Sequence, residues 1–115
     1  MLIEFDKLEE TVQEHFRGGD GSVTSRKYTD ANIKISLGRL SPGGPIGLHL
    51  HDTNSEVIYI LSGAGKAFYD GDYETLVPGS CHYCPQGHSH SLINDGTEEL
   101  CYLAVIPEHF HRSAL

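Results

Sequence analysis

Short apolar segments separated by turn residues constrain the fold of this chain more than any other feature. Most of the intervening turns contain Gly or Pro, and Asp70-Gly71 is typical of a two-residue hairpin turn because Gly accepts a positive φ. Strands spaced about 8–12 residues apart indicate a sandwich or barrel. We therefore expect an all-β domain with strands at residues 23–28, 31–40, 46–51, 56–61, 65–69, 73–77, 81–84, 89–94 and 99–106.

A short N-terminal helix is expected over residues 6–16. Asp6 and Glu9 have the spacing of a capping box, and apolar side chains follow at roughly helical spacing before two glycines. The apolar positions are Leu8, Val12 and Phe16, and the glycines are Gly18 and Gly19. Such a helix would cover one end of the β domain.

Length and composition fit one globular domain. The chain has 115 residues, 38% of them hydrophobic, with a mean hydropathy of -0.29. We divide it into an N-terminal helix and lead-in (1–22), a barrel domain (23–107) and a C-terminal tail (108–115). His109 and His111 in the tail repeat an H-x-H spacing, but no suitably spaced carboxylate follows them.

Charge and targeting features exclude several classes of partner. The net charge is -8 and the basic residues are scattered along the chain, which argues against nucleic acid and anionic lipid as partners. The longest apolar runs are far shorter than the roughly 20 residues of a membrane span. Acidic residues occupy the N-terminus where a signal peptide would carry positive charge, and the three cysteines are an odd number. We expect a cytoplasmic protein with free thiols.

A histidine pair and a carboxylate are the first candidate for metal chemistry. His49 and His51 lie two residues apart on one expected strand, so their side chains point to the same face. Glu56 begins the next expected strand after a short loop, which lets its carboxylate approach the same point. Taken alone, this spacing is also compatible with ordinary polar residues at a sheet edge.

Two longer motifs contain these residues. The first is G-x5-H-x-H-x4-E-x6-G and the second is G-x5-P-x-G-x2-H-x3-N. Their fixed positions are Gly43, His49, His51, Glu56 and Gly63, then Gly79, Pro85, Gly87, His90 and Asn94. Through these two motifs the chain resembles the cupin superfamily. The resemblance covers residues 43–94; the flanking strands are similar to the family in character only.

The resemblance implies a fold, a ligand set and a cofactor. The fold would be a cupin jelly-roll β-barrel, also called a double-stranded β-helix. The metal ligands would be His49, His51, Glu56 and His90, holding one divalent transition metal per chain. Three imidazoles and one carboxylate suit Fe, Mn, Ni, Co, Zn or Cu better than Mg or Ca, and in six-coordinate geometry they leave two positions open.

Further residues within the second motif are candidates for acid–base catalysis or for lining the interior. His88 and Tyr83 are the candidates for acid–base catalysis, although an exposed turn is the alternative position for His88. Residues 82 and 84 share one face of their strand and residues 81 and 83 the other, and the sequence leaves open which face is internal. Cys81 and Cys84 therefore point to opposite faces, which argues against a shared zinc or redox site.

The sequence indicates the function less directly than it indicates the metal site. We expect a metal-dependent enzyme of dioxygenase, isomerase or lyase type acting on a small oxygenated metabolite. Alternatives are non-catalytic binding or sensing of a sugar or metabolite, and an interaction protein with a vestigial site. Lys34 and Arg39 lie on opposite faces, so at most one points inward, and the scattered basic residues disfavour a phosphosugar. Resemblance further implies a homodimer that uses residues 23–40.

Overall fold

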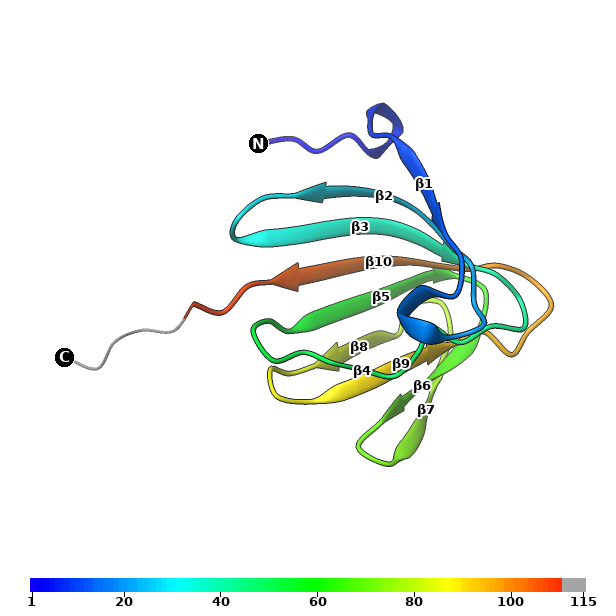
Figure 1. The fold of residues 1–115 in the computed structure, drawn as a ribbon. Coiled ribbons are helices and arrows are strands. Elements are labelled where there is room, and N and C mark those ends of the chain that lie inside the picture. The colour runs from blue at the N-terminus through cyan, green and yellow to red at the C-terminus, as the bar shows by residue number, and fades with distance from the viewer. Residues whose placement is uncertain (111–115) are drawn as a thin grey trace.

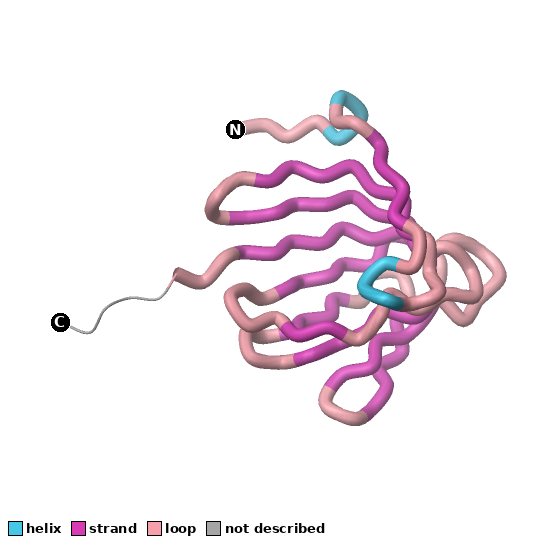
Figure 2. Tube along the Cα trace, in the orientation of Figure 1, coloured by secondary structure: helices cyan, strands magenta, loops and turns pink. Residues whose placement is uncertain are grey.

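Antiparallel β-structure makes up nearly all of the regular secondary structure of the chain, and the computed structural model describes residues 1–110 (Figures 1 and 2). The elements are η1 (Phe5–Lys7), β1 (Glu10–Gln13), η2 (Phe16–Gly18), β2 (Val23–Thr29), β3 (Ile33–Leu40), β4 (His49–Leu50), β5 (Glu56–Ser62), β6 (Gly65–Tyr69), β7 (Asp72–Leu76), β8 (Cys81–Cys84), β9 (Ser89–Ile93) and β10 (Leu100–Pro107). Within residues 1–110, no helix has the length and apolar character needed to cross a membrane.

The strands form two sheets, which Figure 1 shows in one view. A six-stranded sheet has the order β1-β2-β3-β10-β5-β8, and a four-stranded sheet has the order β4-β9-β6-β7. Strands far apart in sequence are neighbours, since β10 lies between β3 and β5, and β9 lies between β4 and β6. This topology brings the two predicted motifs to one place.

The expected strands from residue 23 onward are all present, with small differences at their ends. At Asp70 and Gly71 both φ angles are positive, 50° and 80°, as a tight hairpin turn between β6 and β7 requires. The longest departure is at residues 46–51, where only His49–Leu50 is a strand. Ile46 nevertheless donates its backbone N–H to the carbonyl oxygen of Leu92, so this segment still lies along β9.

The predicted helix at residues 6–16 was wrong. Only the two 3-10 turns η1 and η2 occur there, and between them β1 pairs with β2 in antiparallel register, Glu10 opposite Arg26. Short isolated helices are only marginally stable, whereas the edge of β2 offers a full row of backbone partners. The sheet edge therefore determines the conformation of this segment, and Val12 stays 58% exposed.

Alternation along the strands places the core between the sheets. On β10, Leu100, Tyr102 and Ala104 are buried, and on β5 Ile58 and Ile60 are buried. These residues belong to a core cluster completed by Val23, Leu40, Ile46, Ala67, Leu76 and Leu92. Glu56 has the same parity as Ile58, so its carboxylate points into the interior as well.

β1 covers the outer edge of β2, so β1 and β8 are the edge strands of the larger sheet. A homodimer through residues 23–40 stays a prediction, and any edge-to-edge pairing on that side would involve β1. The expected tail begins at residue 108, and the described part of it lies against the loop after β4. There Glu108 accepts a hydrogen bond from Asn54, and His109 donates its backbone N–H to Thr53. His111 lies outside the described residues.

Candidate metal centre

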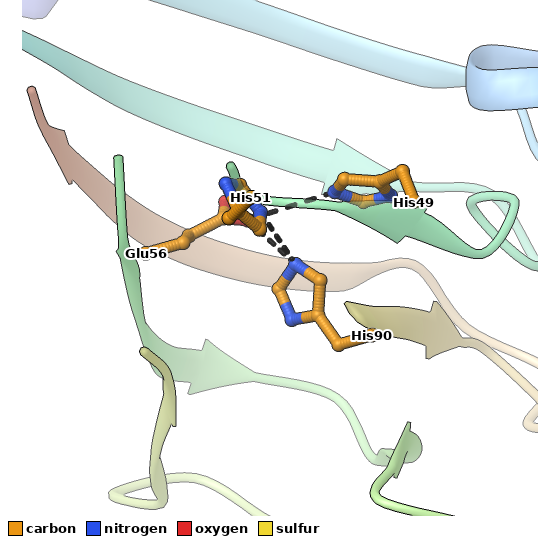
Figure 3. Close-up of side chains that lie close together, drawn as sticks. All are labelled: His49, His51, Glu56 and His90. Atoms are coloured by element: carbon orange, nitrogen blue, oxygen red, sulfur yellow. Dashed lines mark hydrogen bonds and ion pairs between the residues drawn. The ribbon is translucent and has the colours of Figure 1, made fainter. Parts of the chain in front are cut away.

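The four residues of the two motifs converge between the sheets (Figure 3). His49 begins β4 and pairs directly with His90 on β9, while His51 follows β4. Glu56, the first residue of β5, reaches the same point from the larger sheet. We refer to these four residues as the ligand cluster: His49, His51, Glu56 and His90.

The potential ligand atoms of the cluster all lie within 4.8 Å of one another. Oε1 of Glu56 is 2.8 Å from Nε2 of His90 and 3.1 Å from Nε2 of His51. Nε2 of His49 lies 4.0 Å from the same oxygen. Three imidazole nitrogens and one carboxylate oxygen therefore face a common centre, as the sequence resemblance implied.

Each histidine of the cluster uses its other ring nitrogen to contact an acceptor. Nδ1 of His49 donates to the carbonyl oxygen of Gly47 at 2.8 Å, and Nδ1 of His51 donates to Oδ1 of Asn54. Nδ1 of His90 lies 2.9 Å from Nε2 of His82, which accepts its proton. These contacts select the tautomers whose Nε2 lone pairs point toward the centre of the cluster.

This donor set fits a divalent transition metal. Three nitrogen lone pairs and a carboxylate repel one another unless a cation lies between them, and N3O sites suit borderline metals. Because the Nδ1 protons are already held, ion binding requires little reorientation of the rings. The four residues are thus suited to hold such an ion, and the identity of that ion is not encoded in the geometry.

The charge states of Glu56 and His90 match what a metal requires. Burial alone would raise the pKa of Glu56, but the ring nitrogens of His49, His51 and His90 that surround its carboxylate hold that pKa well below its usual value. Burial also lowers the pKa of His90, against the opposing effect of Glu56. At neutral pH the carboxylate is therefore ionised and the His90 ring neutral, the forms in which both groups bind metal ions.

His82 is a buried histidine that contacts the ligand cluster through His90. The residue is 2% exposed, its ring lies nearly parallel to that of His90, and its Nδ1 donates to Oε1 of Glu74 at 2.7 Å. The sequence left open which face of β8 is internal. The structure places His82 and Cys84 inside and leaves Cys81 and Tyr83 exposed.

The cluster lies at one wall of a cavity of about 60 Å³. Most of the other walls are apolar, formed by residues such as Phe16, Ile58 and Leu92, together with the buried Tyr102. That volume holds roughly four to six water-sized groups. The cavity therefore suits a ligand of few heavy atoms that contacts the cluster and apolar side chains at once.

Three basic residues also line this cavity: Arg17, Lys27 and Lys34. The prediction that the basic residues do not gather was therefore wrong. Strand alternation could have indicated two of them. Lys27 lies on the same face of β2 as buried Val23 and Ser25, and Lys34 lies on the same face of β3 as buried Ser36. Arg17 reaches the cavity from η2, which packs on Gly47, where a Cβ atom would clash with the Arg17 carbonyl oxygen.

Arg39, by contrast, points outward. It forms ion pairs with Glu10 at 2.8 Å and with Glu99 at 3.3 Å. The expectation that at most one of Lys34 and Arg39 points inward is confirmed. The inward residue is Lys34.

The two residues suggested for acid–base catalysis do not line the cavity. Tyr83 is 55% exposed on the outer face of β8. His88 stacks on Tyr69, and its Nδ1 lies 3.0 Å from Oδ1 of Asp70 at the surface. A catalytic role for either residue stays a prediction, and the geometry gives it no support.

Comparisons with known proteins agree with the geometry of the cluster. Residues 36–106 match the family model described as Cupin domain. The chain is 30% identical over 112 residues to an oxalate-binding protein of Thermotoga maritima, covering 92% of this chain and 93% of that protein.

Solved structures give the same result. A crystal structure from Thermotoga maritima, described as a predicted oxalate decarboxylase, has a TM-score of 0.86 at 28% identity, covering 94% of this chain and 99% of that one. A cupin-superfamily sugar phosphate isomerase from Silicibacter pomeroyi has a TM-score of 0.77 at 22% identity, covering 94% and 76% of the two chains. With the family model spanning more than half of its residues, the chain belongs to the cupin family.

Proposed function

We propose that the ligand cluster binds one divalent transition-metal ion, and that the chain is a metal-dependent enzyme acting on a small oxygenated metabolite. One observation supports this most strongly. Four ligand atoms within 4.8 Å of one another, three of them on imidazoles with their Nδ1 protons already held, face a cavity that a ligand can enter. A purely structural site would instead be closed by a full set of protein ligands.

Small carboxylates such as oxalate are the substrate class we propose. A bound ion would supply a Lewis acid that polarises an oxygen atom of the ligand. Two relatives carry names that refer to oxalate, as an oxalate-binding protein and as a predicted oxalate decarboxylase. The cavity volume of about 60 Å³ favours a ligand of this size over a sugar phosphate.

The residues around the cluster would attract and orient such a ligand. Lys27 and Lys34 provide positive charge at the cavity wall, and Phe16 and Leu92 exclude water from part of it. Polar contacts are stronger in such an environment because the local dielectric constant is low. Binding and orientation of the ligand are thus assigned to side chains that this chain itself supplies.

Binding without turnover is the second candidate, and one observation favours it. Decarboxylation of oxalate breaks the C–C bond, releases CO2 and needs a proton to complete formate. Among the described residues that line the cavity, the only histidines and carboxylic acids are those of the ligand cluster. A general acid of those residue types is therefore missing from the wall, as expected for a protein that binds its ligand and releases it unchanged.

Calorimetry and product analysis on one preparation separate the candidates. Protein purified without an affinity tag should contain about one transition-metal ion per chain, and His90→Ala should contain almost none. Oxalate should bind the metal-loaded protein and not His90→Ala. Formate and CO2 would establish the enzyme, whereas tight binding without product would establish the binding protein. Metal-repleted protein that retains no ion would refute both.

A further inference from the structure

We infer that Lys27 and Lys34 form an anion-binding subsite in the same cavity as the ligand cluster, which makes the chain selective for small dicarboxylates. The inference rests on the proposed function, because it assigns the second half of the same cavity. It goes beyond that function by naming the residues that select the ligand's charge.

The two lysines are neighbours on one internal wall. Lys27 lies on β2 and pairs with Ser36 of β3, and Lys34 lies two residues from Ser36 on the same strand. Residues in this diagonal relation point to the same face and lie close enough for long side chains to meet one ligand. Both line the cavity that holds the ligand cluster.

Ion pairing divides the described basic residues into two groups. The outward-facing ones each contact a carboxylate: Lys7 with Glu4, Arg26 with Glu10, Arg39 with Glu10 and Glu99, and Lys66 with Asp95. Among residues 1–110, the basic side chains without a carboxylate within 4 Å are Arg17, Lys27 and Lys34. These are the same three that line the cavity.

That division is informative because the chain is strongly acidic, with a net charge of -8. Carboxylates are abundant on the surface, yet within residues 1–110 none lies within 4 Å of the ammonium group of Lys27 or Lys34. Burial, followed by the charge of Lys34, lowers the pKa of Lys27, so the pair is held together without a partner that would relieve its repulsion. A ligand anion would provide that relief.

The excess of positive charge favours a ligand with more than one negative charge. A divalent ion with Glu56 leaves one net positive charge, and the lysine pair adds two more before Arg17 is counted. A neutral ligand would leave these charges uncompensated in a partly apolar cavity. A small dicarboxylate can place oxygens on the metal at one end and on the ammonium groups at the other, within the limited volume available.

The test compares ligands and variants by calorimetry on metal-loaded protein. Oxalate and malonate serve as dicarboxylates, glycolate as a monocarboxylate, and inorganic phosphate as the alternative dianion. Lys27→Met and Lys34→Met should each weaken oxalate binding by about tenfold or more, since each removes a charge-assisted hydrogen bond. Lys27→Arg, which keeps the charge, should recover most of the lost affinity.

Lys66→Met is the matched control, because Lys66 is a lysine on β6 that does not line this cavity and is paired with Asp95. It should leave oxalate affinity unchanged. Metal content is measured for every variant and should equal that of the wild type, which separates this inference from the proposed metal site. If Lys27→Met and Lys34→Met bind oxalate as tightly as Lys66→Met, the subsite is refuted. Equal affinity for glycolate and oxalate, or tighter binding of phosphate, would refute the dicarboxylate selectivity.

Discussion

The buried rings of His82 and His90 lie edge to edge and nearly parallel, with Nε2 of His82 2.9 Å from Nδ1 of His90 and the ring centroids 5.1 Å apart. Beyond His82, Glu74 accepts the Nδ1 proton, so a carboxylate and two imidazoles form one hydrogen-bonded chain that ends at the ligand cluster. Such outer contacts fix the tautomer of a ligating histidine and raise its basicity. The position of His90 therefore depends on a residue at a variable position of the second motif, between Gly79 and Pro85.

Replacing His82 should weaken metal binding without removing any ligand. His82→Leu deprives the Nδ1 proton of His90 of its acceptor, and we expect a loss of about 10- to 100-fold in metal affinity. His82→Gln should lose less, because its amide oxygen can still accept that proton. Competition with a chromogenic chelator measures these affinities.

His88→Leu is the control for this experiment, because His88 contacts Asp70 and Tyr69 rather than the cluster. Its metal affinity should equal that of the wild type. Thermal unfolding of the metal-free variants shows whether packing has been damaged. Equal affinities for His82→Leu and His88→Leu would show that the contact between His82 and His90 has no effect on the metal.

Metal removal should lower the thermal stability of the wild type. An ion that binds only the folded state stabilises it by about 2.7 kcal/mol at a concentration one hundred times its Kd. For a domain of this size that corresponds to a Tm shift of roughly 10 °C. Differential scanning fluorimetry with and without chelator should show this shift for the wild type and no shift for His90→Ala. An identical Tm in both conditions would count against a metal in the wild-type protein.

The strands could be predicted from local signals, and the ligand cluster from local spacing together with the resemblance to a family. Turn residues such as Asp70-Gly71 and apolar alternation along β5 and β10 mark strands within a few residues of sequence. Local spacing indicated His49, His51 and Glu56, and the resemblance of both motifs to the cupin superfamily added His90. The N-terminal segment could not be predicted in this way, because its strand β1 depends on the distant edge of β2, which the local pattern around Val12 does not reveal.

Two features of the cavity could not be predicted from the sequence for a related reason. β8 has four residues, and a polar or thiol side chain lies at every position, so no apolar face marked His82 as internal. Lys27 and Lys34 are separated in sequence, and only pairing of β2 with β3 brings them to one wall. Strand alternation places Lys27 on the same face as Ser25, and Lys34 on the same face as Ser36, and both serines are buried. The basic residues are scattered along the sequence, however, and this distribution gave no indication that the two lysines share one wall.

Thiol reactivity should distinguish the two faces of β8. Burial, and secondarily the charge of Glu56, raises the pKa of Cys84 to about 11, whereas Cys81 is exposed. At pH 8 about one Cys84 thiol in a thousand is ionised, and only the thiolate reacts with disulfide reagents. We expect Ellman's reagent to modify Cys81 rapidly in the native protein and Cys84 only after unfolding or near pH 11. Cys81→Ser should abolish the rapid phase, and a rapid phase that persists in this variant but not in Cys84→Ser would contradict the assignment.

Lys27 should contribute to ligand binding at a cost in stability. Because burial and the charge of Lys34 lower its pKa, the folded protein binds this proton less tightly than the unfolded chain does. The charged form therefore destabilises the fold below the lowered pKa, and this penalty disappears as the pH rises above the ordinary lysine value. In ligand-free protein at pH 7, Lys27→Met should raise the Tm, and the difference should shrink toward pH 11. Oxalate affinity of the wild type should fall over the same alkaline range, because the ammonium form is lost. Thermal scans and calorimetry at several pH values test both effects, and a Lys27→Met variant less stable than the wild type at pH 7 would show that the lysine is already compensated within the fold.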